Sequence, residues 1–287
     1  MASRDRPLLT VPAPAKVNLF LHVTGRRPDG YHLLESLFAL VDLSDAITLA
    51  RREDGLIRRT LELEGVPAAD DLALRAARVL QEASGTRFGV DVHVEKRIPL
   101  GGGLGGGSSD AASVLLALNR MWGLAMPRAE LLRLGGTLGA DVPFFIGGDN
   151  AVARGVGDVL TPVSLVPRWI ALAFPAAVVP TSSIFAAPEL TRATPSAKMD
   201  VFSEGYGRND LEGVAAGRYP PVAAAIDALS RGSSHARMTG SGACVFAAFA
   251  TEFQARAALD MLPTDCAGRV VRTLARHPLA GFAGHAD

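Results

Sequence analysis

The sequence predicts a two-domain protein of mixed helices and strands. Its 287 residues are more than a single core usually fills. A chain with 48% hydrophobic and 20% charged residues is typical of a globular protein that buries a large core. Strand-like and helix-like periods follow one another along the chain, which favours an α/β or α+β arrangement. We expect the boundary near Val166, where Pro162 and Pro167 flank a linker between residues 1–165 and 166–287.

The first expected element is a strand over residues 15–23. Apolar and polar residues alternate there, which is typical of a half-buried strand and places Lys16 and Asn18 on one face. Residues 27–31 read Arg-Pro-Asp-Gly-Tyr and predict a tight turn, because proline presets φ and glycine accepts a positive φ. Tyr31 and His32 lie directly beyond this turn.

The next elements lead into a glycine-rich loop. We expect a helix over residues 71–83, capped by Asp70 or Asp71, and a strand over 90–95 that stops before Pro99. A loop follows, and residues 108–110 (Ser-Ser-Asp) predict the N-cap of a helix over 111–121.

This loop is the most informative feature of the sequence. Six of the seven residues from Gly101 to Gly107 are glycine, which suits consecutive amides that converge on an anion at the start of a helix. A flexible connector is the alternative. Gly101, Gly103 and Gly106 satisfy the G-x-G-x-x-G pattern, but no second parallel strand with a terminal acid follows. The lysine of a P-loop is also absent. The sequence therefore predicts a phosphate-binding loop of a third kind.

The rest of the chain also alternates between expected helices and expected strands. A helix over 128–138 ends at Gly139, and Asp141 lies in the turn that follows. The remaining expected strands are 151–154, 159–163, 169–174, 243–249 and 269–274, and the remaining helices are near 210–217, 221–230 and 251–262.

Charge and cysteine content exclude several classes of protein. Lys plus Arg (29) equals Asp plus Glu (29), so no global field attracts nucleic acid or an anionic membrane. The two cysteines lack metal-ligand spacing, no acidic cluster marks a metal site, and no long apolar run predicts a membrane span. We expect a cytoplasmic protein that captures a small anion locally.

The loop resembles the P-x-x-x-G-L-G-S/G-S-S motif of the GHMP kinases. Further resemblance lies in residues 14–21, 27–32, 139–145 and 239–246, in the order that this family shows. The resemblance implies an α+β fold of two domains, an N-terminal nucleotide domain like domain 2 of ribosomal protein S5 and a C-terminal ferredoxin-like domain. It also implies ATP with Mg²⁺ as cofactors, and a small-molecule acceptor that is a cytidine diphosphate derivative, in a monomer or homodimer.

The resemblance also implies roles for particular residues. Lys16 and Asp141 match the catalytic pair, with Asp141 orienting or deprotonating the acceptor hydroxyl and Lys16 offsetting charge. The acceptor side comprises Asn18, Tyr31, His32, Phe185, Thr239, Gly240, Ser241 and Gly242. The ATP side comprises Pro99, Leu100, Gly101, Gly102, Gly103, Leu104, Gly105, Gly106, Gly107, Ser108 and Ser109.

Plainer interpretations remain open from the residues alone. Asp141 is also consistent with a turn residue, Lys16 with a solvated lysine, and Phe185 with core packing. The nearest rival function is another kinase of the family, acting on homoserine, a sugar or mevalonate. A nucleic-acid-binding protein and a regulatory ATP-binding module are the two rivals from different classes of protein. The role of Asn209 and Asp210 is not predicted.

Overall fold

Two antiparallel-rich sheets organise the molecule. The computed structural model describes residues 7–196, 205–233 and 235–283. The first sheet has the order β3-β4-β2-β5-β6, with β1 paired to β2, and the second has the order β10-β7-β9-β8. The first comprises β1 (Leu8–Arg26), β2 (His32–Arg52), β3 (Ile57–Arg59), β4 (Gly89–Glu95), β5 (Ala151–Arg154) and β6 (Val159–Pro162). The second comprises β7 (Trp169–Phe174), β8 (Arg237–Met238), β9 (Val245–Phe249) and β10 (Ala267–Arg272).

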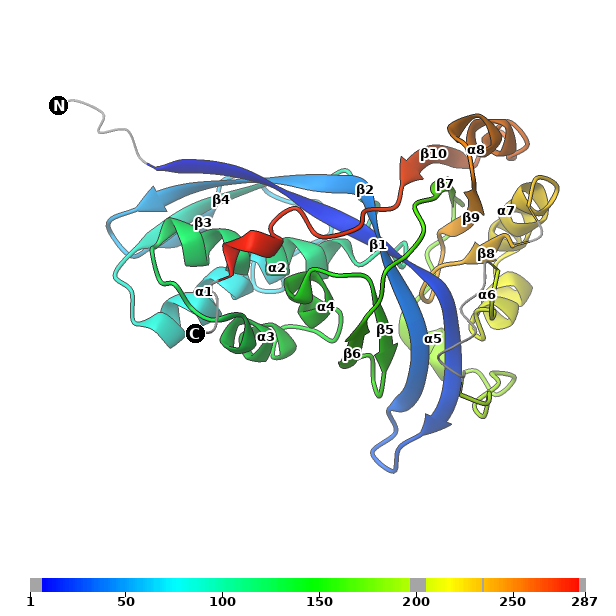
Figure 1. Cartoon of the computed structure of the whole chain (residues 1–287), viewed down its shortest axis with the longest axis horizontal. Coiled ribbons are helices and arrows are strands. Elements are labelled where there is room, and N and C mark those ends of the chain that lie inside the picture. Colours follow the sequence, from blue (N-terminus) through cyan, green and yellow to red (C-terminus); the bar gives the residue numbers. More distant parts are fainter. Residues whose placement is uncertain (1–6, 197–204, 234, 284–287) are drawn as a thin grey trace.

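Helices cover one side of each sheet (Figure 1). The first half carries α1 (Leu72–Ser84), α2 (Gly106–Met121), α3 (Arg128–Gly136) and α4 (Val142–Gly147). The second half carries α5 (Thr181–Phe185), α6 (Glu212–Arg218), α7 (Pro220–Ser230) and α8 (Glu252–Leu259). Asp71 caps α1, since its side chain accepts a hydrogen bond from the Ala73 amide, and the helix ends at Gly85 with a φ of 63°. Among the described residues, no helix has the length and apolarity that a membrane crossing needs.

The long β1–β2 hairpin spans both halves of the molecule. Its register shifts between Asn18 and Phe20, which is a β-bulge that leaves Leu19 unpaired with β2. Beyond the bulge, β1 bonds to the second half: the Leu21 amide donates to the Arg208 carbonyl, and the Asp210 amide donates to the Leu21 carbonyl. The hairpin therefore carries residues from the first half to the boundary with the second.

Three of the four apolar clusters among the described residues lie where the layers of the molecule meet. One lies between the first sheet and α1, α2 and α4, and another lies between the second sheet and α6 and α7. The third joins the two sheets through residues such as Val17, Ala39, Leu172 and Phe246. Because these side chains are buried, the two sheets pack directly on one another.

Residues 273–283, which we call the strap, return from the second sheet to the first half. The Leu274 amide donates to the Leu40 carbonyl (2.8 Å), and the His277 amide donates to the Gly148 carbonyl (2.7 Å). The strap ends in the short 3₁₀ turn Ala280–Phe282, the red segment beside α2 in Figure 1. The boundary at residues 165 and 166 stays a prediction, and the chain crosses between the halves again at the strap.

Two expectations from the sequence need correction. The N-cap of α2 is Gly105, and residues 108–110 already lie inside the helix, because the Ser109 amide bonds to the Gly105 carbonyl. Asp141 lies in a turn, as predicted, but the residues that follow it form a short helix, α4, which was not predicted; Pro143 in its first turn favours helix entry. The 21-residue strand β2 was not predicted.

Candidate functional site

The glycine loop adopts a backbone that requires glycine. Gly101, Gly103 and Gly105 have φ angles of 70°, 74° and 73°. A Cβ atom on Gly103 would lie 2.3 Å from the Thr239 carbonyl oxygen, so the loop also passes very close to another segment. The carbonyl of Leu104 in the loop accepts a hydrogen bond from the Lys16 amide (3.0 Å), which holds the loop against β1. The loop leads directly into the N-terminus of α2, where amides and the helix dipole favour an anion.

The segment opposite the glycine loop is residues 239–242, which we call the second loop. The Thr239 hydroxyl accepts a hydrogen bond from the Asn18 amide (2.8 Å), and the Ser241 hydroxyl lies 2.7 Å from that of Thr181. The Asn209 side-chain amide donates to the Met238 and Gly240 carbonyls, both at 2.8 Å. Asn209, whose role could not be predicted from the sequence, therefore holds the second loop in place.

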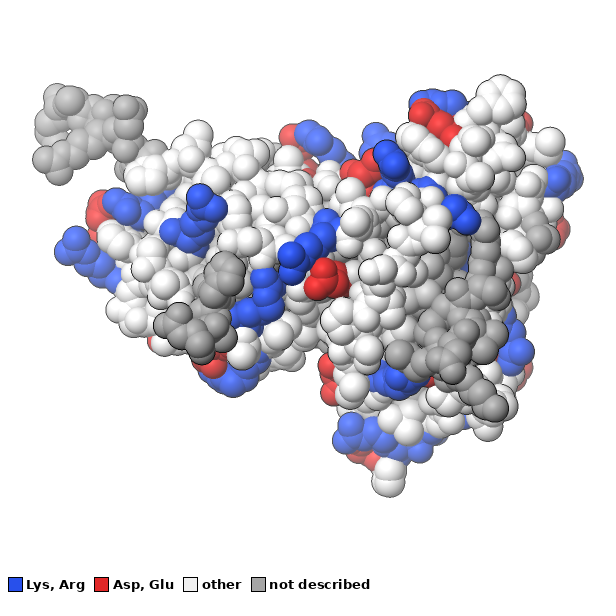
Figure 2. Space-filling view, in the orientation of Figure 1, with Lys and Arg blue, Asp and Glu red and all other residues white. Residues whose placement is uncertain are grey.

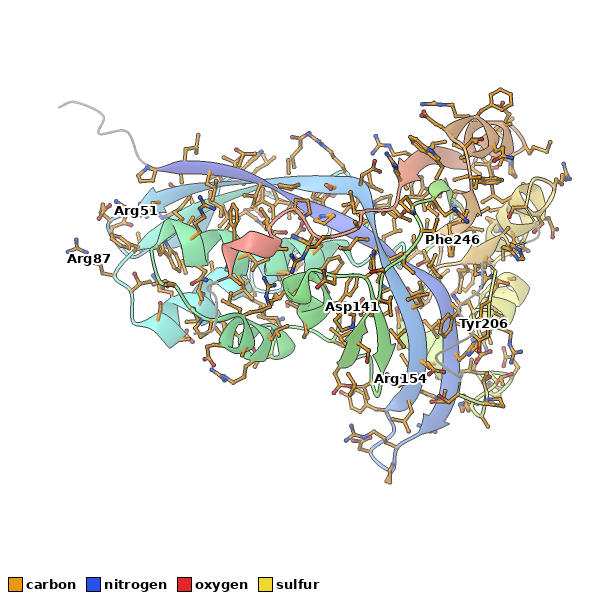
Figure 3. All side chains as sticks on the ribbon, in the orientation of Figure 1. Arg51, Arg87, Asp141, Arg154, Tyr206 and Phe246 are labelled. Atoms are coloured by element: carbon orange, nitrogen blue, oxygen red, sulfur yellow. The ribbon has the colours of Figure 1, made fainter. Side chains whose placement is uncertain are left out.

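Lys16 and Asp141 form an ion pair at the junction of these loops. Lys16 Nζ lies 3.4 Å from Asp141 Oδ2 and donates to Asn18 Oδ1 at 2.6 Å. The lysine is buried over the Phe38 ring, whereas the aspartate side chain is 32% exposed. Asp141 occupies the N-cap position of α4 without capping the helix, so its carboxylate remains available to a ligand. Figure 3 shows it near the middle of the molecule.

A cleft of about 460 Å³ brings ten of the predicted site residues together. Lys16 and Asp141 line it together with residues of both loops, and Phe185 lines it as well. The predicted residues that line the cleft are Lys16, Asn18, Gly101, Gly103, Gly105, Ser108, Asp141, Phe185, Gly240 and Ser241.

Tyr31 and His32 are not among the residues that line this cleft. Tyr31 is 66% exposed in the turn before β2. The His32 ring faces Phe185 with a centroid distance of 5.0 Å and an interplanar angle of 34°. The two rings come from segments about 150 residues apart in sequence, and the fold brings them together as one aromatic pair.

Other members of the predicted set have different surroundings. The Ser109 hydroxyl is buried and donates to the Pro14 carbonyl (2.6 Å), so it holds α2 to β1 instead of facing the cleft. Leu104 is also buried. Leu100 and Gly107 line a neighbouring pocket. Pro99, Gly102, Gly106, Thr239 and Gly242 line neither space.

The neighbouring pocket, of about 230 Å³, was not predicted from the sequence. It lies beside the glycine loop and is lined by residues that include Leu63, Leu72, Lys96, Leu100 and Asp110. A loop that borders both spaces suits a ligand that extends from one to the other. Residues 62–64 of this pocket belong to a stretch of the sequence without a distinctive motif, and the pocket forms only where the fold brings them to the glycine loop.

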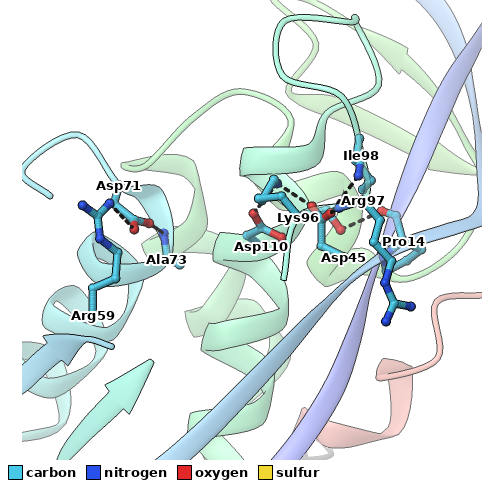
Figure 4. A network of polar contacts seen from close by, with 10 residues as sticks. Pro14, Asp45, Arg59, Asp71, Ala73, Lys96, Arg97, Ile98 and Asp110 are labelled. Carbon is cyan, nitrogen blue, oxygen red and sulfur yellow. Dashed lines mark hydrogen bonds and ion pairs between the residues drawn. The ribbon is translucent and has the colours of Figure 1, made fainter. Parts of the chain in front are cut away.

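A buried ionic network, shown in Figure 4, borders this pocket through Lys96 and Asp110. Lys96 Nζ contacts both Asp45 and Asp110, the latter at 2.8 Å. Asp45 also accepts hydrogen bonds from the Arg97 and Ile98 amides, whereas Asp110 Oδ1 is buried without a partner in the described structure. Burial raises the pKa of Asp110 to about 7, although Lys96 opposes this shift. Burial lowers the pKa of Lys96, but Asp110 and Asp45 outweigh burial and the net shift is upward.

Comparisons with known proteins identify the family to which the chain belongs. The model of the GHMP kinases N terminal domain matches residues 71–149, and that of the GHMP kinases C terminal matches residues 190–268. The chain belongs to the GHMP kinase family and has its two-domain α+β fold. It is therefore an ATP-dependent phosphotransferase.

Particular relatives narrow the comparison. The chain is 54% identical over 281 residues to 4-diphosphocytidyl-2-C-methyl-D-erythritol kinase of Cupriavidus metallidurans, covering 96% of both chains. It is 53% identical to the protein of that name from Ralstonia pickettii, covering 99% of this chain and 100% of the relative. A solved 4-(cytidine 5'-diphospho)-2C-methyl-D-erythritol kinase superposes with a TM-score of 0.82 at 36% identity, covering 92% of this chain and 99% of the other. A homoserine kinase from Cytophaga hutchinsonii, at 15% identity, covers 96% and 97% with a TM-score of 0.71 and shows the fold alone.

Proposed function

We propose that the chain transfers the γ-phosphoryl group of ATP to the 2-hydroxyl of 4-diphosphocytidyl-2-C-methyl-D-erythritol, in the non-mevalonate pathway of isoprenoid synthesis. One observation carries this proposal: the Lys16–Asp141 pair lies in a cleft between a phosphate-binding loop and an acceptor side marked by Phe185. The relatives named above support the choice of acceptor.

The nucleotide extends along the glycine loop in this proposal. Its phosphates contact the loop amides and the start of α2, and its base enters the neighbouring pocket beside Lys96. Among the described residues, no group of three or more His, Cys, Asp or Glu side chains has the arrangement of a metal site. A Mg²⁺ ion that arrives with ATP would be held mainly by phosphate oxygens and water, and Asp141 and Ser108, which line the cleft, are the side chains that could contact it.

Lys16 and Asp141 supply the chemistry at the acceptor hydroxyl. Phosphoryl transfer asks for positioning and charge stabilisation more than for covalent catalysis. Asp141 orients the hydroxyl and accepts its proton. Lys16 stabilises the Asp141 carboxylate and the negative charge on the transferring group, and Asn18 fixes the lysine side chain through the 2.6 Å hydrogen bond.

The aromatic residues recognise the cytosine ring. Stacking of a base on an aromatic side chain contributes about 1 to 3 kcal/mol. Phe185 and Tyr31 offer such surfaces, and the packing of the His32 ring against Phe185 supports a role for this side in holding planar rings. On the face seen in Figure 2, cationic and anionic side chains are interspersed, which suits a small-molecule ligand more than a nucleic acid. We further propose a cytoplasmic location and a monomer or homodimer.

ATP consumption tests the proposal directly. The purified protein is assayed with Mg²⁺ and either the cytidylylated methylerythritol or uncytidylylated methylerythritol phosphate. We expect turnover with the first acceptor alone. Turnover of homoserine, a sugar or mevalonate in its place would assign the chain to another activity of the family and would overturn the proposed acceptor.

A further inference from the structure

Arg192 connects the two aromatic residues of the acceptor side. Its Nε donates a hydrogen bond to His32 Nε2 at 3.3 Å. Its Nη2 donates to the carbonyl of Phe185 (3.2 Å) and to that of Ala187 (2.5 Å), and its Nη1 donates to the Leu190 carbonyl (3.1 Å). One guanidinium thus holds the segment that carries Phe185 and the ring of His32 at the same time.

These contacts determine which nitrogen of His32 carries the proton. A guanidinium group donates hydrogen bonds and accepts none, so Nε2 must present its lone pair to Arg192. The neutral ring then carries its proton on Nδ1. Burial lowers the pKa of His32, and the two cations that face it, Arg192 and Arg26, lower it further. No hydrogen bond to Nδ1 is seen among the described residues, so this N–H is available to a ligand.

We propose that Arg192 fixes His32 in its Nδ1–H tautomer and so makes the acceptor side select cytosine over uracil. This inference rests on the proposed function and deepens it. Cytosine presents acceptors at N3 and O2, which pair with an N–H donor. Uracil carries a hydrogen on N3, so a donor at His32 would meet a donor. Unmatched polar groups in a binding site cost much more than a missing apolar contact. Arg192 acts as a positioning residue, through His32.

Arg192→Met tests the proposal, and Arg218→Met is the matched control. Arg218 lies in the same half but bonds to Glu189 and to the Ser183 carbonyl. At pH 8 we expect Arg192→Met to raise KM for the cytidylylated acceptor about tenfold or more, as for one lost polar contact, with KM for ATP unchanged. The preference for this acceptor over its uridine analogue should fall to a similar extent. The control should match the unaltered protein.

Acid should partly rescue the Arg192→Met variant. Without Arg192, the ring takes the Nε2–H tautomer that histidine favours in water, and Nδ1 loses its proton. Below the ordinary histidine pKa of about 6.5, protonation restores the Nδ1–H donor. The acceptor KM of the variant should therefore fall toward that of Arg218→Met between pH 8 and pH 6. The ratio of the acceptor KM of the unaltered protein to that of Arg218→Met should stay constant over the same range.

Nitrogen NMR of the His32 ring gives a readout that needs no substrate. Its signal is assigned by comparison with His32→Gln, and the Nδ1–H tautomer is expected in the unaltered protein and in the control, but not in Arg192→Met. An unchanged tautomer in the variant, or equal losses for ATP and acceptor without acid rescue, would overturn the proposal. If the protein turned over another acceptor while the tautomer changed as expected, the proposed function would fail and the tautomer assignment would stand.

Discussion

Asp141 is the residue on which the proposed chemistry depends most. Replacing it with asparagine keeps the size of the side chain but removes the base, so we expect Asp141→Asn to lower kcat by roughly 10²- to 10⁴-fold. KM for ATP should change little, because in the proposed binding mode the glycine loop and the neighbouring pocket hold the nucleotide. Steady-state kinetics with both substrates measure the two effects. Asp149→Asn, which alters a carboxylate paired with Arg276 outside the cleft, is the control, and equal losses in both variants would argue against a role for Asp141 in proton transfer.

Asp110 makes stability depend on pH in the neutral range. Its pKa is about 7 in the folded protein and near 3.9 in an unfolded chain, so between these values the folded state holds the extra proton. This contribution therefore falls as the pH rises from about 4 to about 7. Asp110→Asn removes the titration and can still accept a hydrogen bond from Lys96. Urea unfolding should show that the free energy of unfolding of the variant gains roughly 2 to 3 kcal/mol relative to that of the unaltered protein between pH 5 and pH 7.5. A constant difference would show that Asp110 stays ionised when buried.

The sequence could predict site residues wherever they belong to a local pattern. Alternation along β1 placed Lys16 and Asn18 on one face, and the structure confirms their contact. It could not predict the Lys96 network, because Asp45, Lys96 and Asp110 meet only through the fold. Arg192 was missed for the same reason, since its bond to His32 spans 160 positions. Ser109 was predicted as an ATP-side residue from its place in the motif, but its hydroxyl is buried and bonds to the Pro14 carbonyl.

At the scale of elements, the contact between the glycine loop and the second loop sets the shape of the cleft. Gly103→Ala would press a Cβ atom against the Thr239 carbonyl, whereas a Cβ atom on Gly101 meets nothing within 4 Å. Both positions have positive φ, so Gly101→Ala controls for backbone strain, which costs roughly 1 to 2 kcal/mol. We expect Gly103→Ala to cost on the order of 3 kcal/mol or more in unfolding free energy and to raise KM for ATP. Equal effects of the two substitutions would contradict the close contact.

Elements with strong local signals were predicted, and those defined by long-range pairing were not. Asp71 was among the two expected caps of α1, and strands β4, β5 and β7 lie where alternation or apolar runs placed them. Strand β2 has a continuous apolar run over residues 37–41 instead of a period-two alternation. Its 21-residue length depends on pairing with β1, β4 and β5, which the sequence does not show. The start of α2 was misplaced because Gly105, at positive φ, ends the loop four residues before Ser109.

At the scale of the molecule, the strap that connects the two halves makes the stability of the fold sensitive to acid. His277 is buried in it, its Nδ1 accepts a hydrogen bond from the Leu279 amide, and its Nε2 is buried without a partner in the described structure. Burial, with a smaller effect of Arg128, lowers the pKa of His277 to about 4. The ring is neutral when folded and protonates near pH 6.5 when unfolded, so its contribution is intact above pH 6.5 and is lost as the pH falls toward 4.

His277→Asn should reduce this acid sensitivity. The asparagine oxygen can replace Nδ1 as acceptor for the Leu279 amide, and the side chain does not titrate. Unfolding free energies measured from pH 7 to pH 4.5 should show the variant gaining roughly 2 kcal/mol relative to the unaltered protein. A difference that stays constant over this range would mean that His277 is already protonated, or exposed, in the folded state.

Two domains of mixed class were predictable from length and composition, whereas their connections were not. The comparisons confirm the GHMP kinase fold that the motifs implied. No pattern in the sequence indicated that β1 bonds to the second half or that the strap returns to the first, because hydrogen bonds such as Leu274 to Leu40 join residues more than 200 positions apart.

The strap also imposes an order on synthesis. The carbonyls of Leu40 and Gly148 and the side chain of Asn150 receive partners from residues 274–277. These residues leave the ribosome only after the whole second sheet has been translated. Domains usually fold as units during translation, N-terminal first. Here the nascent first half must wait, with part of its core uncovered, until residues 274–277 emerge to close it.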